Sequence, residues 1–304
     1  MKKLSMNRTV LAVALTAAMG VGSTSAMAAL FNPFNITETS VPGATPNVIT
    51  NAGKIIGSYQ ERAAFTSSGP IGCTGTDCGT FTNSLYFSAG QFNGTDGAPL
   101  SGSQAGQLGG GAFGTNQYQL YALFMGMGTY VTTAGKTVFT FSPGGDLKVY
   151  IDPDSNTTAV ASTSTTPFIR SNFADDYLIA TGVPMSGVGT LDPTLSTCSS
   201  SGPGSNINCG SFGTQTSFVL TTGDAFPLLP GLQSGSGYFT APNPFYSLSF
   251  QSGQFDNFTP SGIQDIVGSA DITFGNAVPE PESIALLGIG LLGLSIARRR
   301  RKQA

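Results

Sequence analysis

The side chains that could carry chemistry in this 304-residue chain are mainly carboxylates and amides. The segment 152–156 reads DPDSN and offers oxygen ligands at alternate positions, as the start of a calcium loop does. An EF-hand is excluded, because Thr157 stands where that loop needs a glycine and Thr163 where it needs a glutamate. Two interpretations remain open: a looser Ca²⁺ site made by Asp152, Asp154 and Asn156, or an ordinary turn that follows a strand.

A second acidic pair, Asp175-Asp176, suggests sugar chemistry, since glycosidases need two carboxyl groups that flank the scissile bond. Adjacent residues on a strand point to opposite faces, so we do not expect these two to act together. A carbohydrate-active enzyme would instead combine Asp175 with Asp152. The simpler interpretation is a pair of solvated acids at a strand start. The chain has no His, which excludes Ser-His and Cys-His catalysis and HExxH metal sites. We therefore expect a protein that is not an enzyme.

The four cysteines form two local pairs, Cys73 with Cys78 and Cys198 with Cys209. Four cysteines allow three disulfide connectivities, and we favour the local one because each bridge then closes a single loop. Such bridges stabilise exported proteins by restricting the unfolded chain, by about 2–3 kcal/mol each. A four-cysteine zinc site is the alternative, but the intervals of four and ten residues do not match the usual pairs.

Aromatic residues are the third group with a possible binding role. They can stack on sugar rings when exposed, or fill the core of a β protein when they point inwards, and we favour core filling. The residues concerned are Tyr118, Tyr121, Tyr130, Tyr238, Phe239, Phe245 and Tyr246.

Strands must position these side chains, because residues 29–277 are rich in Gly, Ser, Thr and Asn and contain no stretch of helical period. The sequence predicts a single all-β domain, a sandwich or jelly-roll-like fold with long Gly/Ser-rich loops at 94–114 and 196–213. An irregular arm is expected over 31–53. The predicted strands are 54–65, 80–91, 117–131, 137–142, 147–151, 174–181, 217–222, 245–250 and 270–274.

Alternation within two of these strands gives more detail. Phe139 and Phe141 share one face of the first, and Leu147, Val149 and Ile151 share one face of the second. The intervening segment 143–146 reads PGGD, a turn signal, so we predict a β-hairpin over 137–151.

Both ends of the chain carry targeting signals. A cationic start, an apolar stretch over 10–21 and a small-residue site at Ala26, Ala28 and Ala29 predict a signal peptide over 1–28. Once the ends are set aside, residues 29–277 hold five basic and fourteen acidic residues, a net charge of −9. Such an acidic body argues against nucleic acid or anionic membrane as a partner.

The C-terminal end has three parts in a fixed order. Val278, Pro279, Glu280 and Pro281 form a short extended motif, because neither proline can continue a helix. The apolar run 283–297 predicts a transmembrane helix about 22 Å long, shorter than the ~30 Å hydrocarbon core unless its flanks snorkel. A basic anchor, expected on the cytoplasmic side, closes the chain and consists of Arg298, Arg299, Arg300, Arg301 and Lys302.

This ending resembles the PEP-CTERM sorting signal of Gram-negative bacteria. The resemblance implies recognition and cleavage by an exosortase, transient insertion in the inner membrane, and delivery to the cell surface or extracellular matrix. It covers about a tenth of the chain, residues 278–304.

The body resembles flocculation-associated PEP-CTERM proteins over roughly 54–176, in the segments GSYQE (57–61), LYFSAGQF (85–92), YQLYALF (118–124) and LKVYIDPDS (147–155). This resemblance implies a non-catalytic protein that holds cells together in flocs with exopolysaccharide. The sequence leaves two alternatives: the carbohydrate-active enzyme described above, and a matrix scaffold without a specific ligand.

Overall fold

The computed structural model describes residues 32–39, 41–67, 77–109, 118–198, 209–220, 237–241, 247–252 and 259–275. The predicted signal peptide and the predicted sorting signal lie outside these ranges, as do Cys73, Phe245 and Tyr246. Within the described ranges, no helix is long and apolar enough to cross a membrane.

Strands make up almost all of the regular structure, and the described part holds one short 3-10 helix, η1 (Gly102–Ala105). The all-β prediction is confirmed. The strands are β1 (Phe34–Thr37), β2 (Val48–Thr66), β3 (Cys78–Gly94), β4 (Gln119–Thr133), β5 (Lys136–Phe141), β6 (Asp146–Asp152), β7 (Thr158–Val160), β8 (Ile169–Ser171), β9 (Tyr177–Leu191), β10 (Gly210–Leu220), β11 (Phe239–Ala241), β12 (Ser247–Ser252) and β13 (Gly262–Gly275).

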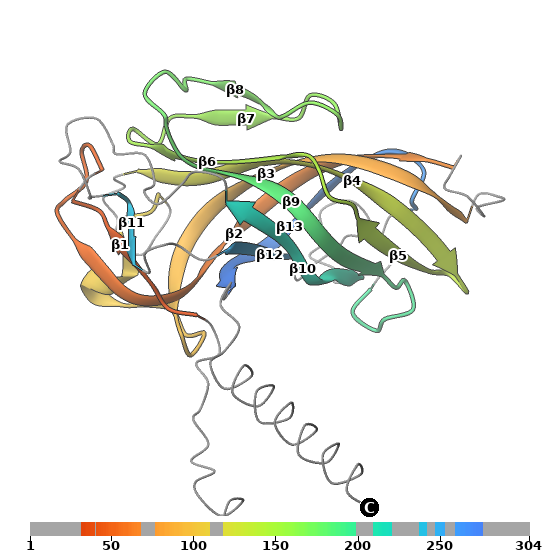
Figure 1. Cartoon of the computed structure of the whole chain (residues 1–304), viewed down its shortest axis with the longest axis horizontal. Helices are drawn as coiled ribbons and strands as arrows, with labels where there is room; N and C mark the ends of the chain where they lie inside the picture. Colours follow the sequence, from red (N-terminus) through yellow and green to blue (C-terminus); the bar gives the residue numbers. More distant parts are fainter. Residues whose placement is uncertain are drawn as a thin grey trace, which may run out of the picture.

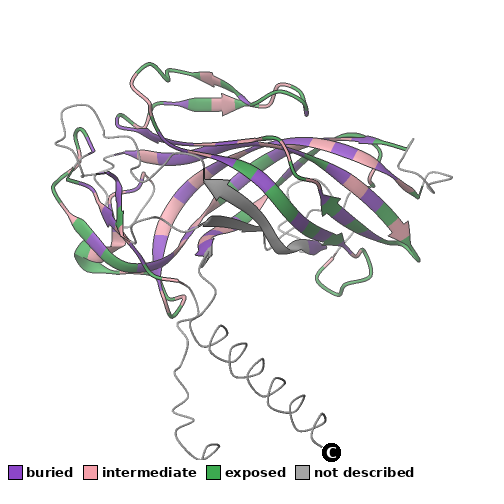
Figure 2. Cartoon of the chain, viewed as in Figure 1, coloured by how far each residue is buried: buried purple, intermediate pink, exposed green. Residues whose placement is uncertain are grey.

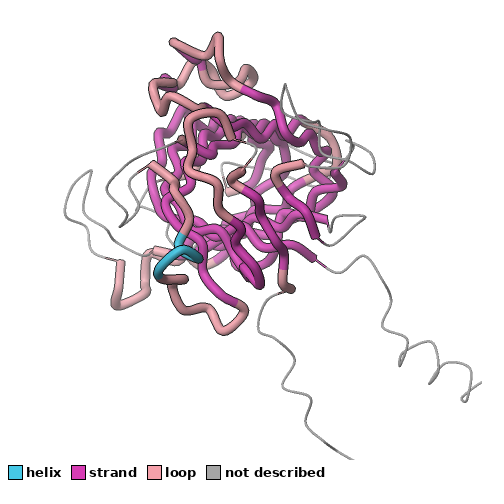
Figure 3. Tube along the Cα trace, turned by 90° about the vertical axis from the view of Figure 1, so that its left-hand side faces the viewer, coloured by secondary structure: helices cyan, strands magenta, loops and turns pink. Residues whose placement is uncertain are grey.

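The main sheet closes on itself. From β2 the hydrogen-bonded neighbours are β13, β12, β10 and β9, then β5 and β6, then β4 and β3, which pairs again with β2. Neighbours in this ring are antiparallel. Figure 3 shows the strands surrounding a common interior. Opposite walls therefore face each other as the sheets of a sandwich do, but hydrogen bonds join them and leave the ring no free edge.

The predicted hairpin over 137–151 is wrong, because β5 and β6 do not pair with each other. Both lie between β4 and β9 and together act as one interrupted strand of the ring. The interruption contains Gly144 and Gly145, both at positive φ, and a Cβ on Gly145 would lie 2.2 Å from the Met125 carbonyl oxygen. The PGGD segment is thus a bulge in which position 145 has no room for a side chain. The real hairpin joins β4 to β5 through Ala134 and Gly135, both also at positive φ.

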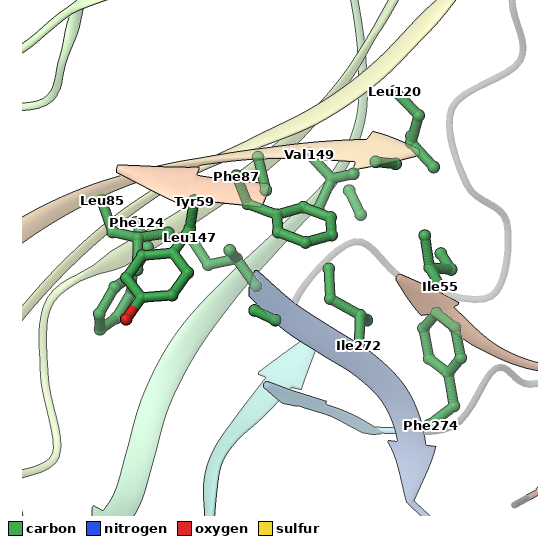
Figure 4. Close-up of a cluster of buried hydrophobic side chains, with 14 of the residues drawn as sticks. Ile55, Tyr59, Leu85, Phe87, Leu120, Phe124, Leu147, Val149, Ile272 and Phe274 are labelled. Carbon is green, nitrogen blue, oxygen red and sulfur yellow. The ribbon is translucent and has the colours of Figure 1, made fainter. Parts of the chain in front are cut away.

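Alternation of side chains fills the interior of the ring. Phe139 and Phe141 are buried inside it, while Val138, which immediately precedes Phe139, is 43% exposed, as the sequence predicts. Leu147, Val149 and Ile151 point inwards as well. Side chains from β3, β6 and β13 meet in this core, where Figure 4 shows Phe87, Val149 and Ile272, and Figure 2 shows buried and exposed positions alternating along the strands.

A separate hairpin covers part of the outer surface. Strands β7 and β8 pair only with each other among the described strands and lie above β3 and β6 in Figure 1. We call residues 153–176, which contain this hairpin, the outer arm. Beneath it lies a second apolar cluster, formed by Tyr121, Leu123 and Tyr150 of the sheet and Phe168 of the outer arm. The outer arm therefore has its own apolar contact with the ring.

The N-terminal arm is more regular than predicted. Within the segment 31–53, β1 pairs with β2 and β11, and β2 begins at Val48. The fully buried carboxylate of Glu38 accepts hydrogen bonds from the Asn47 and Gln107 side chains at 2.9 Å, the Gln107 backbone N–H at 2.6 Å and the Tyr118 hydroxyl at 2.8 Å. These bonds tie the arm to the predicted Gly/Ser-rich loop over 94–114.

Most strand bounds differ from the predictions by only a few residues. The larger differences are in β2, which begins six residues before the predicted start, in β10, which begins seven residues before it, and in the two strands described next. Strand β9 begins at Tyr177, three residues after the predicted start, and continues to Leu191 through Pro184. Strand β13 begins at Gly262, eight residues before the predicted start. Gly and Pro residues hid both extensions, because the sequence reading treated them as strand ends.

Cys198 and Cys209 form a disulfide, with Cα atoms 4.5 Å apart, as predicted. Cys78 is disulfide-bonded as well, while its predicted partner Cys73 lies outside the described residues. A disulfide sulfur is not a thiolate ligand, so the alternative four-cysteine zinc site is wrong.

Candidate functional site

Three carboxylates converge where the outer arm meets the ring. Asp152 ends β6, and Asp175 and Asp176 immediately precede β9, so the two ends of the outer arm bring them together. One oxygen from each lies within 4.8 Å of the others. The expectation that Asp175 and Asp176 point to opposite faces is wrong, because they lie in a turn before the strand and not on it.

Asp152 is fully buried, and the backbone uses both of its oxygens. Oδ1 accepts the N–H of Asp154 at 3.1 Å, and Oδ2 accepts that of Thr157 at 2.8 Å. This is the aspartate-stabilised turn of the simpler interpretation. Asp154 and Asn156 are exposed, and Asp154 does not join the carboxylate group around Asp152. The predicted Ca²⁺ ligand set is therefore not assembled in the form that the sequence suggested.

Asp176 anchors the outer arm. Its Oδ2 accepts a short hydrogen bond from the Tyr121 hydroxyl and another from Nη1 of Arg170 at 3.1 Å, and its Oδ1 accepts the Thr157 hydroxyl at 2.9 Å. The side chain is only 2% exposed. Burial raises the pKa of Asp176, and the nearby Asp152 charge acts in the same direction.

The cluster fits a divalent cation only in part. One buried oxygen of Asp175, Oδ2, has no hydrogen-bond partner, and three carboxylates share the single cation Arg170, which would favour a hard metal ion. Against this, the hydrogen bonds described above already use the oxygens of Asp152 and Asp176. The same geometry bears on catalysis: Asp175 does lie beside Asp152, but a fully buried Asp152 cannot flank a polysaccharide bond.

The aromatic residues proposed for sugar stacking are core residues wherever the structure describes them. Those that fill the interior of the ring are Tyr118, Tyr130, Tyr238 and Phe239. Tyr121 is buried under the outer arm and stacks on Tyr150, with ring centroids 5.2 Å apart. The core-filling alternative is therefore confirmed for all five.

The structure also shows two buried glutamates that the sequence reading did not single out, Glu38 and Glu61. Glu38 organises the contacts of the N-terminal arm. Glu61 lies among the inward-facing residues of β2, where an alternating apolar pattern surrounds it, and this pattern was the available signal.

Comparison with known proteins bears on the end of the chain. Residues 277–302 match the family model described as the PEP-CTERM protein-sorting motif. The matched range contains Val278 to Pro281, the apolar run and the basic anchor.

No curated protein and no solved structure matches the chain, so the resemblance of the body to flocculation-associated proteins is not confirmed. The matched motif covers the C-terminal end alone, and it indicates where the protein is delivered. The chain is an exported exosortase substrate with a PEP-CTERM sorting signal, bound for the cell surface or the extracellular space.

Proposed function

We propose that this protein is a non-catalytic component of the cell surface or extracellular matrix that promotes cell aggregation together with exopolysaccharide. The observation that carries the proposal is the sorting motif at residues 277–302, which implies delivery to the place where cells meet their matrix. The strand segments that resemble flocculation-associated proteins support the more specific role in cell aggregation.

The described body suits a passive extracellular role. The strands of the closed ring pair on both sides, which leaves the short strands β7, β8 and β11 as the described strands with an unpaired edge and limits uncontrolled pairing with other chains. Each basic residue between 29 and 277 is paired with an aspartate, in the pairs Lys54–Asp271, Arg62–Asp265, Lys136–Asp192, Lys148–Asp146 and Arg170–Asp176. The acids outnumber these basic residues, so the body carries a net negative charge, which favours solubility among other matrix components.

A non-catalytic role agrees with the chemistry of the side chains. The chain has no His, and the one group of three carboxylates among the described residues is largely buried and hydrogen-bonded. A protein of this type would act by binding: one part holds it at the surface, and another contacts the polysaccharide.

The test is floc formation in a strain that lacks this gene, with exosortase and polysaccharide synthesis verified as intact. We expect dispersed cells, and recovery of flocs when the gene is returned. Unchanged settling of the deletion strain would reject the aggregation role and leave an exported surface protein. The purified protein should release no reducing sugar from the host polysaccharide; release that is lost in Asp175→Asn would establish the carbohydrate-active enzyme instead.

A further inference from the structure

A cleft of about 210 Å³ lies between the outer arm and the outer face of the ring. Its floor comes from two paired strands, in which Leu123 of β4 lies opposite Lys148 of β6, and Met125 lies opposite Asp146. Its wall comes from the outer arm and includes Pro167 and Arg170. The cleft therefore combines an apolar surface with two basic groups and one acidic group.

Arg170 is held in place with part of its hydrogen-bonding capacity unused. Its guanidinium lies over the Tyr150 ring at 4.2 Å and the Phe173 ring at 4.6 Å. Nη1 donates to the Tyr121 hydroxyl at 2.7 Å and to Asp176 at 3.1 Å. Within the described part of the chain, Nε and Nη2 have no acceptor. A rigid guanidinium with free donors is the group that binds a carboxylate with the least loss of conformational entropy.

Lys148 supplies the second positive charge. Its ammonium lies 2.7 Å from Asp146, and its side chain is 40% exposed, so it can turn toward a ligand. The hydrogen bond that Lys148 donates to Asp146 raises the pKa of Lys148, while repulsion from Arg170 acts in the opposite direction. Both cations line the same cleft, and an anionic group bound there would reduce the repulsion between them.

The other lining groups restrict what kind of anion fits. Asp146 accepts hydrogen bonds from hydroxyl groups and repels ions with dense charge such as phosphate or sulfate. Leu123, Met125 and Pro167 offer an apolar surface to the C–H face of a sugar ring. The cleft is smaller than the roughly 300–1,000 Å³ of sites that enclose drug-sized ligands, so it accommodates about one sugar ring. A ring with one carboxylate and several hydroxyls satisfies all of these groups.

We propose that this cleft binds one uronic-acid unit of an acidic polysaccharide. Arg170 and Lys148 bind the carboxylate, Asp146 accepts ring hydroxyls, and the apolar floor contacts the ring. The proposal rests on the proposed function for its setting and deepens it by naming the class of sugar. The net negative charge of the body does not prevent binding, because at physiological salt charges beyond about 8 Å are largely screened.

The test is calorimetric titration of the full chain, purified in mild detergent, with trigalacturonate and with a neutral galactose trisaccharide. We expect trigalacturonate to bind at least about tenfold more tightly, as a charge-assisted hydrogen bond provides. Lys148→Ala should weaken that binding about tenfold, and Met125→Trp should abolish it by filling the cleft. Lys136→Ala is the matched control, since Lys136 also pairs with an aspartate and is 57% exposed but does not line the cleft. Trigalacturonate binding that is absent, equal to that of the neutral sugar, or unaffected by both cleft variants would overturn the proposal.

The proposed aggregation role and the proposed ligand of the cleft can be rejected independently of each other. If the gene deletion disperses cells and a Met125→Trp gene restores flocs as well as the unaltered gene, the aggregation role stands, and the cleft does not contribute to it. If the deletion leaves flocs unchanged while trigalacturonate binds as described, the cleft stands and the aggregation role falls. Melting curves of each variant verify that it remains folded. Arg170→Ala is not used, because it would leave the buried Asp176 without its ion-pair partner and destabilise the fold.

Discussion

Two glutamates are buried inside this protein, and they differ in how many hydrogen bonds their carboxyl groups accept. Glu38 accepts four hydrogen bonds, which replace the water that its carboxyl group loses on burial. Glu61 accepts one, from the Asn83 side chain at 2.7 Å. Its Oε2 and the Oδ1 of Asn83 are both buried without a partner. A protonated Glu61 has a hydrogen to donate from Oε2, which an ionised one lacks. Burial accordingly raises the pKa of Glu61 to about 7.

This difference predicts a pH-dependent stability. The folded protein holds the Glu61 proton more strongly than the unfolded chain, whose glutamates titrate near 4.5. The contribution of Glu61 to the free energy of unfolding should therefore be highest below pH 4.5. It should decrease between pH 4.5 and about 7, and it should not change further above that. The expected loss is about 3 kcal/mol. Glu61→Gln imitates the neutral acid, so it should remove this loss and stabilise the protein at pH 8. Urea denaturation at pH 5 and pH 8 measures both effects.

The matched control is the same substitution at the other glutamate. Glu38→Gln places an NH₂ donor among groups that already donate, so it should destabilise the protein by about 1–3 kcal/mol at both pH values. Glu61→Gln that is destabilising at pH 8 would contradict the raised pKa of Glu61, and Glu38→Gln that is neutral would contradict the role of the four hydrogen bonds that Glu38 accepts.

At the level of the strands, the close approach of neighbouring strands limits the size of the side chain that a position can hold. Gly128 of β4 lies opposite Phe81 of β3 and Phe141 of β5. A Cβ at this position would lie 2.1 Å from the Thr140 carbonyl oxygen and 2.7 Å from the Phe81 ring. Neither group can move freely, because one belongs to the ladder and the other to the core. The glycine thus allows aromatic rings to fill the interior beside β4.

Gly128→Ala should therefore destabilise the protein by about 1–3 kcal/mol through overpacking. Gly90→Ala is the control from the neighbouring strand, since the nearest atom to its Cβ would be 3.6 Å away, an ordinary contact. Denaturant midpoints of the two variants test this, and equal midpoints would show that the core beside β4 adjusts to the added methyl group.

At the level of the whole molecule, the sorting signal and the folded body have separate tasks. The matched motif occupies residues 277–302, and the last strand, β13, ends at Gly275. The signal therefore follows the last described strand of the closed sheet in the sequence. Removal of the signal should leave the body folded and change only where the protein goes.

Truncation after Ala277 should abolish exosortase processing and surface delivery, which immunoblots of the cell-surface, membrane and medium fractions would measure. The control is the intact gene in a strain without exosortase, where the protein should also remain unprocessed. Normal surface delivery of the truncated chain would show that the body contains a second sorting signal.

Much of this protein follows from its sequence alone, because the relevant patterns are local. Alternating apolar residues determine which face of a strand is buried, and this identified the inward faces of β5 and β6. Short loops determine which cysteines can meet, and this identified Cys198 with Cys209. The sorting motif is a contiguous stretch at the C-terminal end, which is why its residue types and their order were sufficient to recognise it.

Only the tertiary structure decided how distant strands pair. Closure of the ring depends on β2 meeting both β3 and β13, and the second partner lies about two hundred residues away. Pairing with both β4 and β9 aligned β5 with β6, although the PGGD segment had suggested a hairpin between them. It also brought Asp152 to Asp175 and Asp176, and placed Arg170 over the floor that carries Lys148. Such contacts gain their free energy from burial and hydrogen bonds between separate segments, and no local pattern records which segments will meet.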